Sequence, residues 1–331
     1  MHRLASSVAL WAALFAVAGC SSPDAAPSTS TSTPTPSART TPPSEQPAVG
    51  PTQEPAVKAP APVSPDDLDL RTALRAVRHL AGEIGPREAT GPAYVRASRW
   101  VARALAGLGY DVVRQRFDVP AGESWGVAVP AGRSLNVVAT PTGFDPEEPH
   151  LVVGAHLDTV PQAPGAEDNA SGIGVMLAVA EAVASGRTRL PVVLVAFGAE
   201  EPRGPGDDRH HYGSRDYVAR LTPQQRRGVR AMVSLDRVGV GAGVPVGSAG
   251  EFDPVQRSLL AAARRAGVAT VADPGQRSSD HWSFVRNGLP GARLGSTPYS
   301  GYHSAADVPG VVQPAQLERV GRILLAWVAP R

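Results

Sequence analysis

The sequence predicts an α/β domain in which helices cover both faces of a largely parallel sheet. Short apolar runs, typical of buried strands, alternate along the chain with longer segments whose apolar residues recur at helical spacing. His, Asp and Glu residues directly follow several of the apolar runs. In open α/β sheets, binding residues gather beyond the carboxyl ends of the strands, so this placement favours the same fold.

The segment 1–20 is predicted to be a bacterial lipoprotein signal peptide. Arg3 supplies a positive start, and residues 4–17 form an apolar stretch too short to span a bilayer. The run Val-Ala-Gly-Cys at 17–20 resembles a lipobox, in which the cysteine is lipidated and becomes the mature N-terminus. Because Cys20 is the only cysteine, we expect an exported protein, lipid-anchored to the outer face of the bacterial cell membrane. A buried thiol is the alternative.

Residues 21–65 are predicted to be a disordered tether that leads to one folded domain, residues 66–331. The tether consists mainly of Ser, Thr, Pro and Ala with hardly an aromatic residue, so it cannot bury enough apolar surface to fold. The formal net charge of +2 carries no nucleic-acid signal, and a single cysteine excludes a disulfide within the chain. We therefore expect a catalyst or binder that does not recognise nucleic acid, of unknown oligomeric state.

Helix and strand signals follow one another in an order that suits a parallel sheet. Apolar residues at helical spacing predict helices at residues 66–82, 93–108, 172–184, 214–220, 253–266 and 314–328. Short apolar or alternating runs predict strands at residues 110–117, 135–140, 151–156, 192–197, 232–235 and 292–294. The first of these strands alternates as an edge strand does, and the later strands alternate with helices as in a parallel sheet.

The strand 151–156 and the helix after it carry a pair of metal-ligand side chains. His156 lies where the predicted strand ends, and Asp168 lies where a loop meets the start of the helix. Asp158 follows His156 by two residues and points to the same side of the strand. Its carboxylate could hold one ring N–H of His156 and so leave the other ring nitrogen for a metal.

Further candidates follow the later strands, at positions that a parallel sheet would bring together. The full set of candidate metal ligands is His156, Asp168, Glu201, Asp236 and His303. These residues offer nitrogen and oxygen donors without sulfur, as in open catalytic sites rather than closed structural zinc cages. Three carboxylates can balance two divalent ions, which favours a two-metal site with Asp168 as the bridge.

Glu200 is predicted to be the general base. Adjacent side chains leaving a strand diverge, so Glu200 and Glu201 do not easily bind the same ion. The carboxylate that is left over, beside a water on the metal, can take a proton and return it to the leaving amine.

Each candidate also has an ordinary explanation when taken alone. A histidine such as His156 is often a hydrogen-bonded core residue, and a Glu-Glu pair is often a solvated loop. The coincidence of five donors at successive strand ends favours the metal site. The remaining histidines have no comparable carboxylate set and are not predicted to be ligands; they are His79, His150, His210, His211 and His281.

From about residue 73 onward, the chain resembles the co-catalytic di-zinc exopeptidases of clan MH, of the aminopeptidase Y type. The motifs that carry the resemblance are Gly154-Ala155-His156-Leu157-Asp158-Thr159, Asp168-Asn169-Ala170-Ser171-Gly172, Ala199-Glu200-Glu201, Ser234-Leu235-Asp236, Ser279-Asp280-His281-Trp282-Ser283-Phe284 and Tyr302-His303-Ser304-Ala305-Ala306-Asp307. The resemblance implies a three-layer α/β/α sandwich with a mostly parallel mixed sheet and two zinc ions per chain.

Carried over residue by residue, the resemblance assigns a role to each member of the set. Asp168 would bridge the two zinc ions, with His156 and Asp236 on one ion and Glu201 and His303 on the other. The catalytic group would be Glu200 as the base, Asp158 as the partner of His156, and Tyr302 as a hydrogen-bond donor to the developing oxyanion.

Two features depart from the family pattern. Arg237 stands after Asp236, where the family usually has an apolar residue, and a charge there must pair with a carboxylate or reach the substrate. The loop 202–212 is longer than in the simplest members and is expected to shape the substrate pocket.

The leading hypothesis is an aminopeptidase that removes N-terminal residues from peptides by attack of a zinc-bound hydroxide. A glutaminyl-cyclase-like acyltransferase with a single zinc is the alternative within the fold. An inactive, lipid-anchored peptide-binding protein is the alternative from another class. A serine hydrolase is disfavoured because no Gly-x-Ser-x-Gly elbow lies at a strand-to-helix turn.

Overall fold

The computed structural model describes residues 59–250 and 253–330. The predicted signal peptide, Cys20 and most of the tether lie outside the described residues. Val63, within the predicted tether, is buried, and its backbone N–H donates to the carbonyl oxygen of Arg187 at 3.0 Å, so packing against the domain begins before residue 66. No helix in the described ranges is long and apolar enough to cross a bilayer.

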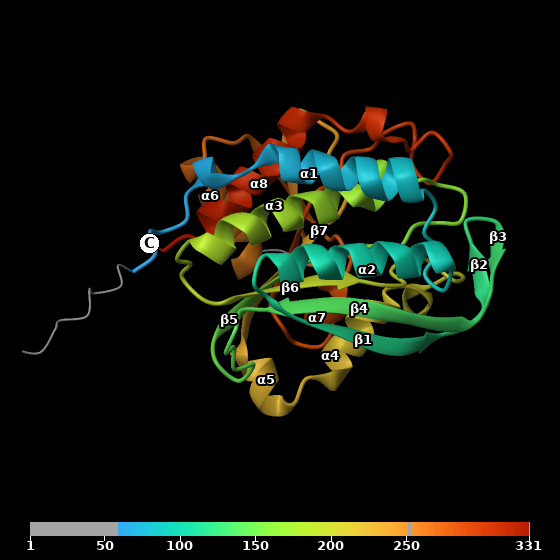
Figure 1. Ribbon diagram of the computed structural model, residues 1–331, viewed down its shortest axis with the longest axis horizontal. Helices are drawn as coiled ribbons and strands as arrows, with labels where there is room; N and C mark the ends of the chain where they lie inside the picture. The colour runs from blue at the N-terminus through green and yellow to red at the C-terminus, as the bar shows by residue number, and fades with distance from the viewer. Residues whose placement is uncertain (1–58, 251–252, 331) are drawn as a thin grey trace, which may run out of the picture. The chain divides into compact units, whose positions relative to one another are not determined.

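The centre of the domain is an eight-stranded mixed sheet (Figure 1). In spatial order its strands are β1 (Asp111–Val119), β4 (Gly132–Thr140), β6 (Val192–Phe197), β5 (His150–His156), β7 (Val229–Leu235), β10 (Gly291–Leu294), β8 (Val244–Ser248) and β9 (Thr270–Pro274). The four central strands β6, β5, β7 and β10 are mutually parallel, and antiparallel pairings flank them on both sides. The predicted mostly parallel mixed sheet is therefore confirmed.

The central strands are apolar along their whole length because both faces of the sheet are covered. In β5 all seven residues are buried, and their side chains alternate between two hydrophobic clusters. Val153 belongs to the cluster under the helices α1 (Leu70–Val77), α2 (Pro92–Gly107), α3 (Ser171–Ser185), α6 (Pro254–Arg265) and α8 (Pro314–Val328). Val152 belongs to the cluster under α4 (Tyr212–Arg220) and α7 (His281–Val285). The structure thus has the three predicted layers.

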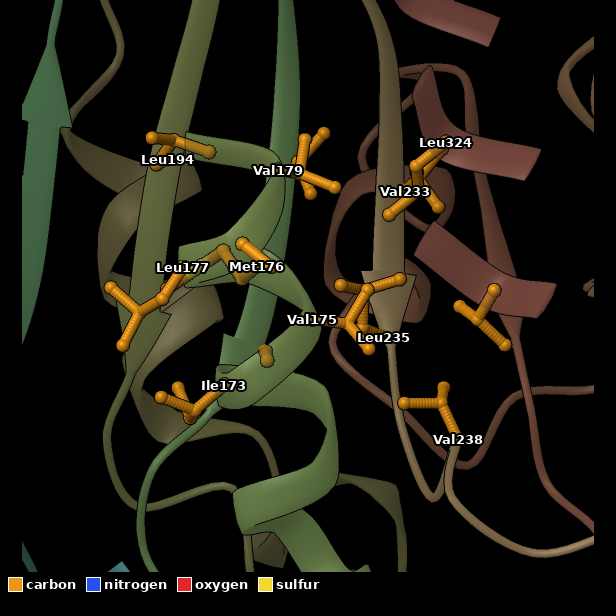
Figure 2. Close-up of a cluster of buried hydrophobic side chains, with 14 of the residues drawn as sticks. Ile173, Val175, Met176, Leu177, Val179, Leu194, Val233, Leu235, Val238 and Leu324 are labelled. Carbon is orange, nitrogen blue, oxygen red and sulfur yellow. The ribbon is translucent and has the colours of Figure 1, made fainter. Parts of the chain in front are cut away.

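Helix α3 is the helix that crosses the middle of the sheet. Fourteen side chains of its cluster are drawn in Figure 2, where Val175 of α3 lies beside Leu235 of β7. Eleven of the fifteen residues of α3 are buried, which explains why its sequence is apolar nearly all round rather than amphipathic. This packing places the N-terminal end of α3 beside the carboxyl ends of the strands.

Several elements were not predicted. The hairpin of β2 (Gly122–Ser124) and β3 (Val127–Val129), the strands β8 and β9, and the short helix α5 (Pro223–Gly228) are additional. Strand β9 is largely exposed at the edge of the sheet, and β8 contains Pro245 and Gly247, so neither shows a continuous apolar run. The first predicted helix is α-helical to Val77 and continues as a π-helical segment, η2 (Arg78–Ile84).

Candidate metal centre

The candidate ligands converge at the carboxyl ends of three neighbouring parallel strands. His156 is the last residue of β5, Glu200 and Glu201 follow the end of β6, and Asp236 follows the end of β7. Because the strand order is β6-β5-β7, these ends lie side by side. All four side chains are buried, with exposed fractions of 2% to 7%. The loops after β5 and β10 bring in Asp168 and His303.

Asp168 is the central carboxylate of the cluster. Its Oδ1 lies 3.1 Å from Nε2 of His156, and its Oδ2 lies 3.1 Å from Nε2 of His303. One carboxylate thus faces two histidines with separate oxygens. The Asp307 carboxylate holds this segment in place by accepting the backbone N–H groups of Glu167 at 2.8 Å and Asp168 at 3.1 Å.

The other predicted ligands complete two adjoining groups. Oδ1 of Asp236 lies 3.8 Å from Nε2 of His156, and Oε2 of Glu201 lies 3.5 Å from Nε2 of His303. Oε2 of Glu200 lies 4.0 Å from Nε2 of His156. Two groups of three residues each have donor atoms that lie within 4.8 Å of one another: the first is His156, Glu200 and Asp236, and the second is His156, Asp168 and Glu201. The structure therefore brings all five predicted ligands and Glu200 together.

The orientation of His156 comes from a main-chain contact. Its Nδ1 lies 3.1 Å from the backbone carbonyl oxygen of Asp158, which can only accept a hydrogen bond. This contact puts the ring proton on Nδ1 and leaves the lone pair on Nε2, toward Asp168. The Asp158 carboxylate, which the sequence placed at this nitrogen, is 3.9 Å away from it. It instead accepts the backbone N–H groups of Glu200 at 3.0 Å and Glu201 at 3.1 Å.

Arg87 supports the loop between His156 and Asp168, a role that sequence reasoning did not assign to it. The side chain is fully buried, and its guanidinium donates to the carbonyl oxygens of Leu157, Pro164 and Gly165, besides those of Leu80 and Gly85. Burial lowers the pKa of Arg87 to about 10, which still leaves it charged at neutral pH. The only sequence signal was its place after the Gly85-Pro86 turn.

The electrostatics of the cluster call for cations. Burial, together with the Asp236 and Asp158 carboxylates, raises the pKa of Glu200 to about 8, although His156 opposes the shift. Burial and the charges of Asp168 and Glu200 raise the pKa of Glu201. Oε1 of Glu201 is buried without a hydrogen-bond partner in the described part of the chain. Buried carboxylates at this spacing are stabilised by metal ions, so the donor set fits hard or borderline divalent cations.

A cavity of about 360 Å³ opens over this cluster. Trp125 and Gly126 form the tight turn between β2 and β3, and both have positive φ angles. This turn brings Trp125 to the wall of the cavity. The Trp125 ring lies 4.3 Å edge-on from the His303 ring, and Tyr302 stacks on His303 with ring centroids 3.7 Å apart. Tyr302 thus lies at the cavity, with its ring packed on a predicted ligand.

The loop 202–212 and the next loops complete the cavity wall. Pro202, Asp207 and His210 line the cavity, as do Arg237 and the segment 275–278. His211 was not predicted to be a ligand, and the structure shows it buried, with its Nε2 3.1 Å from Oε1 of Glu200. Its backbone N–H also donates to the Glu200 carbonyl oxygen at 3.0 Å. The only sequence signal was its place within the long loop.

Two further residues of the motifs lie close to the cluster. His281, which was not predicted to be a ligand, is fully buried, and its Nε2 lies 2.9 Å from the carbonyl oxygen of Gln276. Arg293 of β10 lies behind Asp236, with its Nη1 3.8 Å from Oδ2 of that carboxylate. Arg293 was expected only as part of an apolar strand.

Comparison with curated proteins finds relatives that are described as an aminopeptidase and a probable aminopeptidase. The chain is 28% identical over 207 residues to Aminopeptidase YwaD of Bacillus subtilis, an alignment that covers 59% of this chain and 44% of the relative. It is also 28% identical over 196 residues to the Probable lipoprotein aminopeptidase LpqL of Mycobacterium tuberculosis, covering 56% of this chain and 37% of the relative. The chain therefore spans less than half the length of these two relatives.

Solved structures share the fold. BSAP, a zinc aminopeptidase from Bacillus subtilis, superposes with a TM-score of 0.70 at 19% identity, covering 78% of this chain and 94% of that one. Glutaminyl cyclase from Porphyromonas gingivalis superposes with a TM-score of 0.67 at 20% identity, covering 79% and 98%. The model of peptidase family M28 matches residues 136–328, the segment that carries all five predicted ligands. The chain belongs to peptidase family M28.

Proposed function

We propose that this protein is a zinc-dependent aminopeptidase that removes N-terminal residues from peptides with two metal ions per chain. The observation that carries the proposal is the geometry of Asp168, whose two carboxylate oxygens each face a different histidine at 3.1 Å. A single-metal site has no need of a carboxylate shared in this way. Membership of peptidase family M28 supports the same activity.

Two groups of residues would hold the ions. Asp168 would serve both, with His156 and Asp236 on one side and Glu201 and His303 on the other. When bound, zinc supplies a Lewis acid that polarises a carbonyl oxygen and lowers the pKa of water.

Glu200 would move the proton. Its carboxylate is buried beside the ligand cluster and is not required as a ligand, so it is free to accept a proton from the attacking water and return it to the leaving amine. Asp158 would fix the position of Glu200 through the backbone N–H that it binds at 3.0 Å. His211, 3.1 Å from Glu200, would hold the carboxylate from the other side.

Tyr302 would stabilise the oxyanion. Tyr302 is 38% exposed, and its partial burial together with the negative charge of Asp168 raises the pKa of its hydroxyl, which stays protonated and able to donate a hydrogen bond. The stacking of Tyr302 on His303 places the ring at the cavity wall, beside the ligand cluster. This supports the role of a donor to the charge that develops on the scissile carbonyl.

The lipid anchor and the export of the protein are also proposed. The lipobox at Cys20 supports them, and the relative LpqL is described as a probable lipoprotein. The protein would then bind its peptide substrate outside the cell, at the membrane surface.

The proposal is tested by metal analysis together with a substrate panel. We expect about two zinc ions per chain by mass spectrometry, in keeping with a shared carboxylate bridge. Aminoacyl anilides and unblocked peptides should be hydrolysed, and activity should disappear with chelator and return with zinc. Equal hydrolysis of N-terminally blocked peptides would overturn the exopeptidase assignment. One zinc per chain with pyroglutamate formation from N-terminal glutamine would instead establish a glutaminyl cyclase.

A further inference from the structure

Arg237 stands beside the metal centre in a conformation that aims its side chain at the cavity. It follows Asp236 at the end of β7 and has a φ angle of 55°, in the left-handed region that is unfavourable for a residue with a side chain. The Asn169 side chain supports this conformation, since the Arg237 backbone N–H donates to its Oδ1 at 3.3 Å. The Arg237 side chain is 16% exposed and lines the cavity.

The guanidinium of Arg237 has hydrogen-bonding capacity to spare. Its nearest ionic partner is Oδ1 of Asp236, 3.8 Å from Nε, which is too long for a hydrogen bond. The guanidinium carbon lies 4.4 Å from the ring centroid of Tyr302, so one face of the group is stacked. Within the described ranges it donates no hydrogen bond. Two other buried arginines, Arg87 and Arg203, by contrast direct their guanidinium groups to backbone carbonyls and to Glu88.

Asp236 does not depend on Arg237 for charge compensation. The guanidinium of Arg293, which is 2% exposed, already lies 3.8 Å from the other oxygen of that carboxylate. Arg293 is held in place by Gln276 and Ser278, which its Nη atoms contact at 3.0 to 3.2 Å. Asp236 therefore has a second cationic partner besides Arg237, and a zinc ion held by the same carboxylate would further reduce its need for the Arg237 charge.

We propose that Arg237 binds a carboxylate of the peptide substrate, and that the enzyme prefers substrates with such a group close to the scissile bond. A planar guanidinium with free Nη groups binds a carboxylate through two parallel hydrogen bonds, and stacking on Tyr302 fixes the plane of the guanidinium. Arg277 lines the same cavity and supplies a second cation. This inference rests on the proposed peptidase function and specifies its substrate class.

Two parts of a peptide can supply this carboxylate. One is the side chain of an N-terminal Glu or Asp, and the other is the terminal carboxylate of a dipeptide. Both present a carboxylate to Arg237, and two matched substrate pairs distinguish the two sources. The first pair is the Glu and Gln anilides, and the second pair is Leu-Ala and its C-terminal amide.

The experiment compares kcat/KM within each pair for the zinc-loaded wild-type protein and its variants. We expect the wild type to favour the acid over its amide by about tenfold or more in one pair, since hydrogen bonds to charged groups are the strong ones. The pair that shows the preference identifies the source of the carboxylate. Arg237→Met should bring the ratio close to one through a higher KM for the acid, and Arg237→Lys should keep part of the preference.

A matched control and a measurement without turnover complete the test. Arg71→Met removes the same charge from an arginine whose side chain is 87% exposed on α1, and it should leave the ratio unchanged. Calorimetric titration with glutamate and with glutamine should show tighter binding of glutamate, a difference that Arg237→Met removes, if the side chain is the source.

The outcomes separate this inference from the proposed function. If the wild type hydrolyses all four substrates and Arg237→Met leaves both ratios and the glutamate affinity unchanged, the role of Arg237 is overturned while the peptidase remains. If no substrate is hydrolysed, the proposed function fails. In that case calorimetry alone tests the carboxylate site. Wild-type protein that binds glutamate no more tightly than glutamine, and Leu-Ala no more tightly than its C-terminal amide, would overturn the site as well.

Discussion

The carboxylate of Asp158 accepts the backbone N–H of Glu200 at 3.0 Å, which ties the loop after β6 to the loop after β5. The same carboxylate accepts the N–H of Glu201 at 3.1 Å. Asp158 is fully buried, and burial raises its pKa although these N–H groups oppose the shift. The base and the neighbouring ligand are therefore positioned by one side chain.

Replacing Asp158 by Asn should loosen this connection. The asparagine amide has one oxygen that can accept only one of the two backbone N–H groups, and its NH₂ group faces the remaining N–H. We therefore expect kcat/KM to fall by about 10- to 100-fold. Steady-state kinetics and zinc content are the measurements. Asp118→Asn removes the same charge from an exposed residue of β1 and should have no effect. Unchanged kinetics in Asp158→Asn would show that Glu200 is held by other contacts.

Glu200 and Glu201 are adjacent but should respond differently to the same substitution. Glu200→Gln should lower kcat by roughly 100- to 10,000-fold, the usual contribution of a general base, while zinc content and folding are retained. Glu201→Gln should reduce the zinc content, because its Oε2 lies 3.5 Å from the predicted ligand His303. Mass spectrometry and circular dichroism check both expectations. Full activity in Glu200→Gln would remove Glu200 as the base.

His281 predicts a pH dependence of stability. Burial, with the nearby charge of Arg293, lowers the pKa of His281 from 6.5 to about 3. Between these values the unfolded chain binds a proton that the folded chain does not, so stability is lost as the pH falls below about 6.5, by up to about 1.4 kcal/mol per pH unit. Urea unfolding at several pH values in this range measures the free energy of unfolding as a function of pH. This free energy should fall less steeply with decreasing pH in His281→Gln than in the wild type. An identical slope would contradict the assignment.

Gly154 should tolerate no side chain. A Cβ at this position of β5 would lie 2.4 Å from a ring carbon of Phe197 and 3.1 Å from the carbonyl oxygen of Val195. Gly154→Ala should therefore lower the free energy of unfolding by about 1–3 kcal/mol, as overpacked cores do. Gly107→Ala at the end of α2, where nothing lies within 4 Å, is the matched control. Thermal unfolding measures both, and equal melting temperatures would contradict the expected clash.

The carboxyl-end positions of the ligands were predictable because they follow from a local pattern. His156 and Asp236 each come directly after an apolar run, and parallel strands must place such residues at one edge of the sheet. Strand β9 was missed because an exposed edge strand does not need continuous apolar residues, and β8 was missed because Pro245 and Gly247 interrupt its apolar run.

The sequence by itself determined the α/β architecture and which side chains gather at the strand ends, because buried strands and covering helices leave periodic apolar patterns. Only the tertiary structure decided that Asp158 holds the loop of Glu200 rather than the ring of His156, and that His211 lies beside Glu200. It also decided that Arg293 and Arg237 both lie 3.8 Å from Asp236, and that the Arg237 guanidinium donates no hydrogen bond within the described part of the chain. These contacts join residues on loops that are distant along the chain. The conformation of a loop leaves no periodic pattern in the sequence, so such contacts could not be predicted from it.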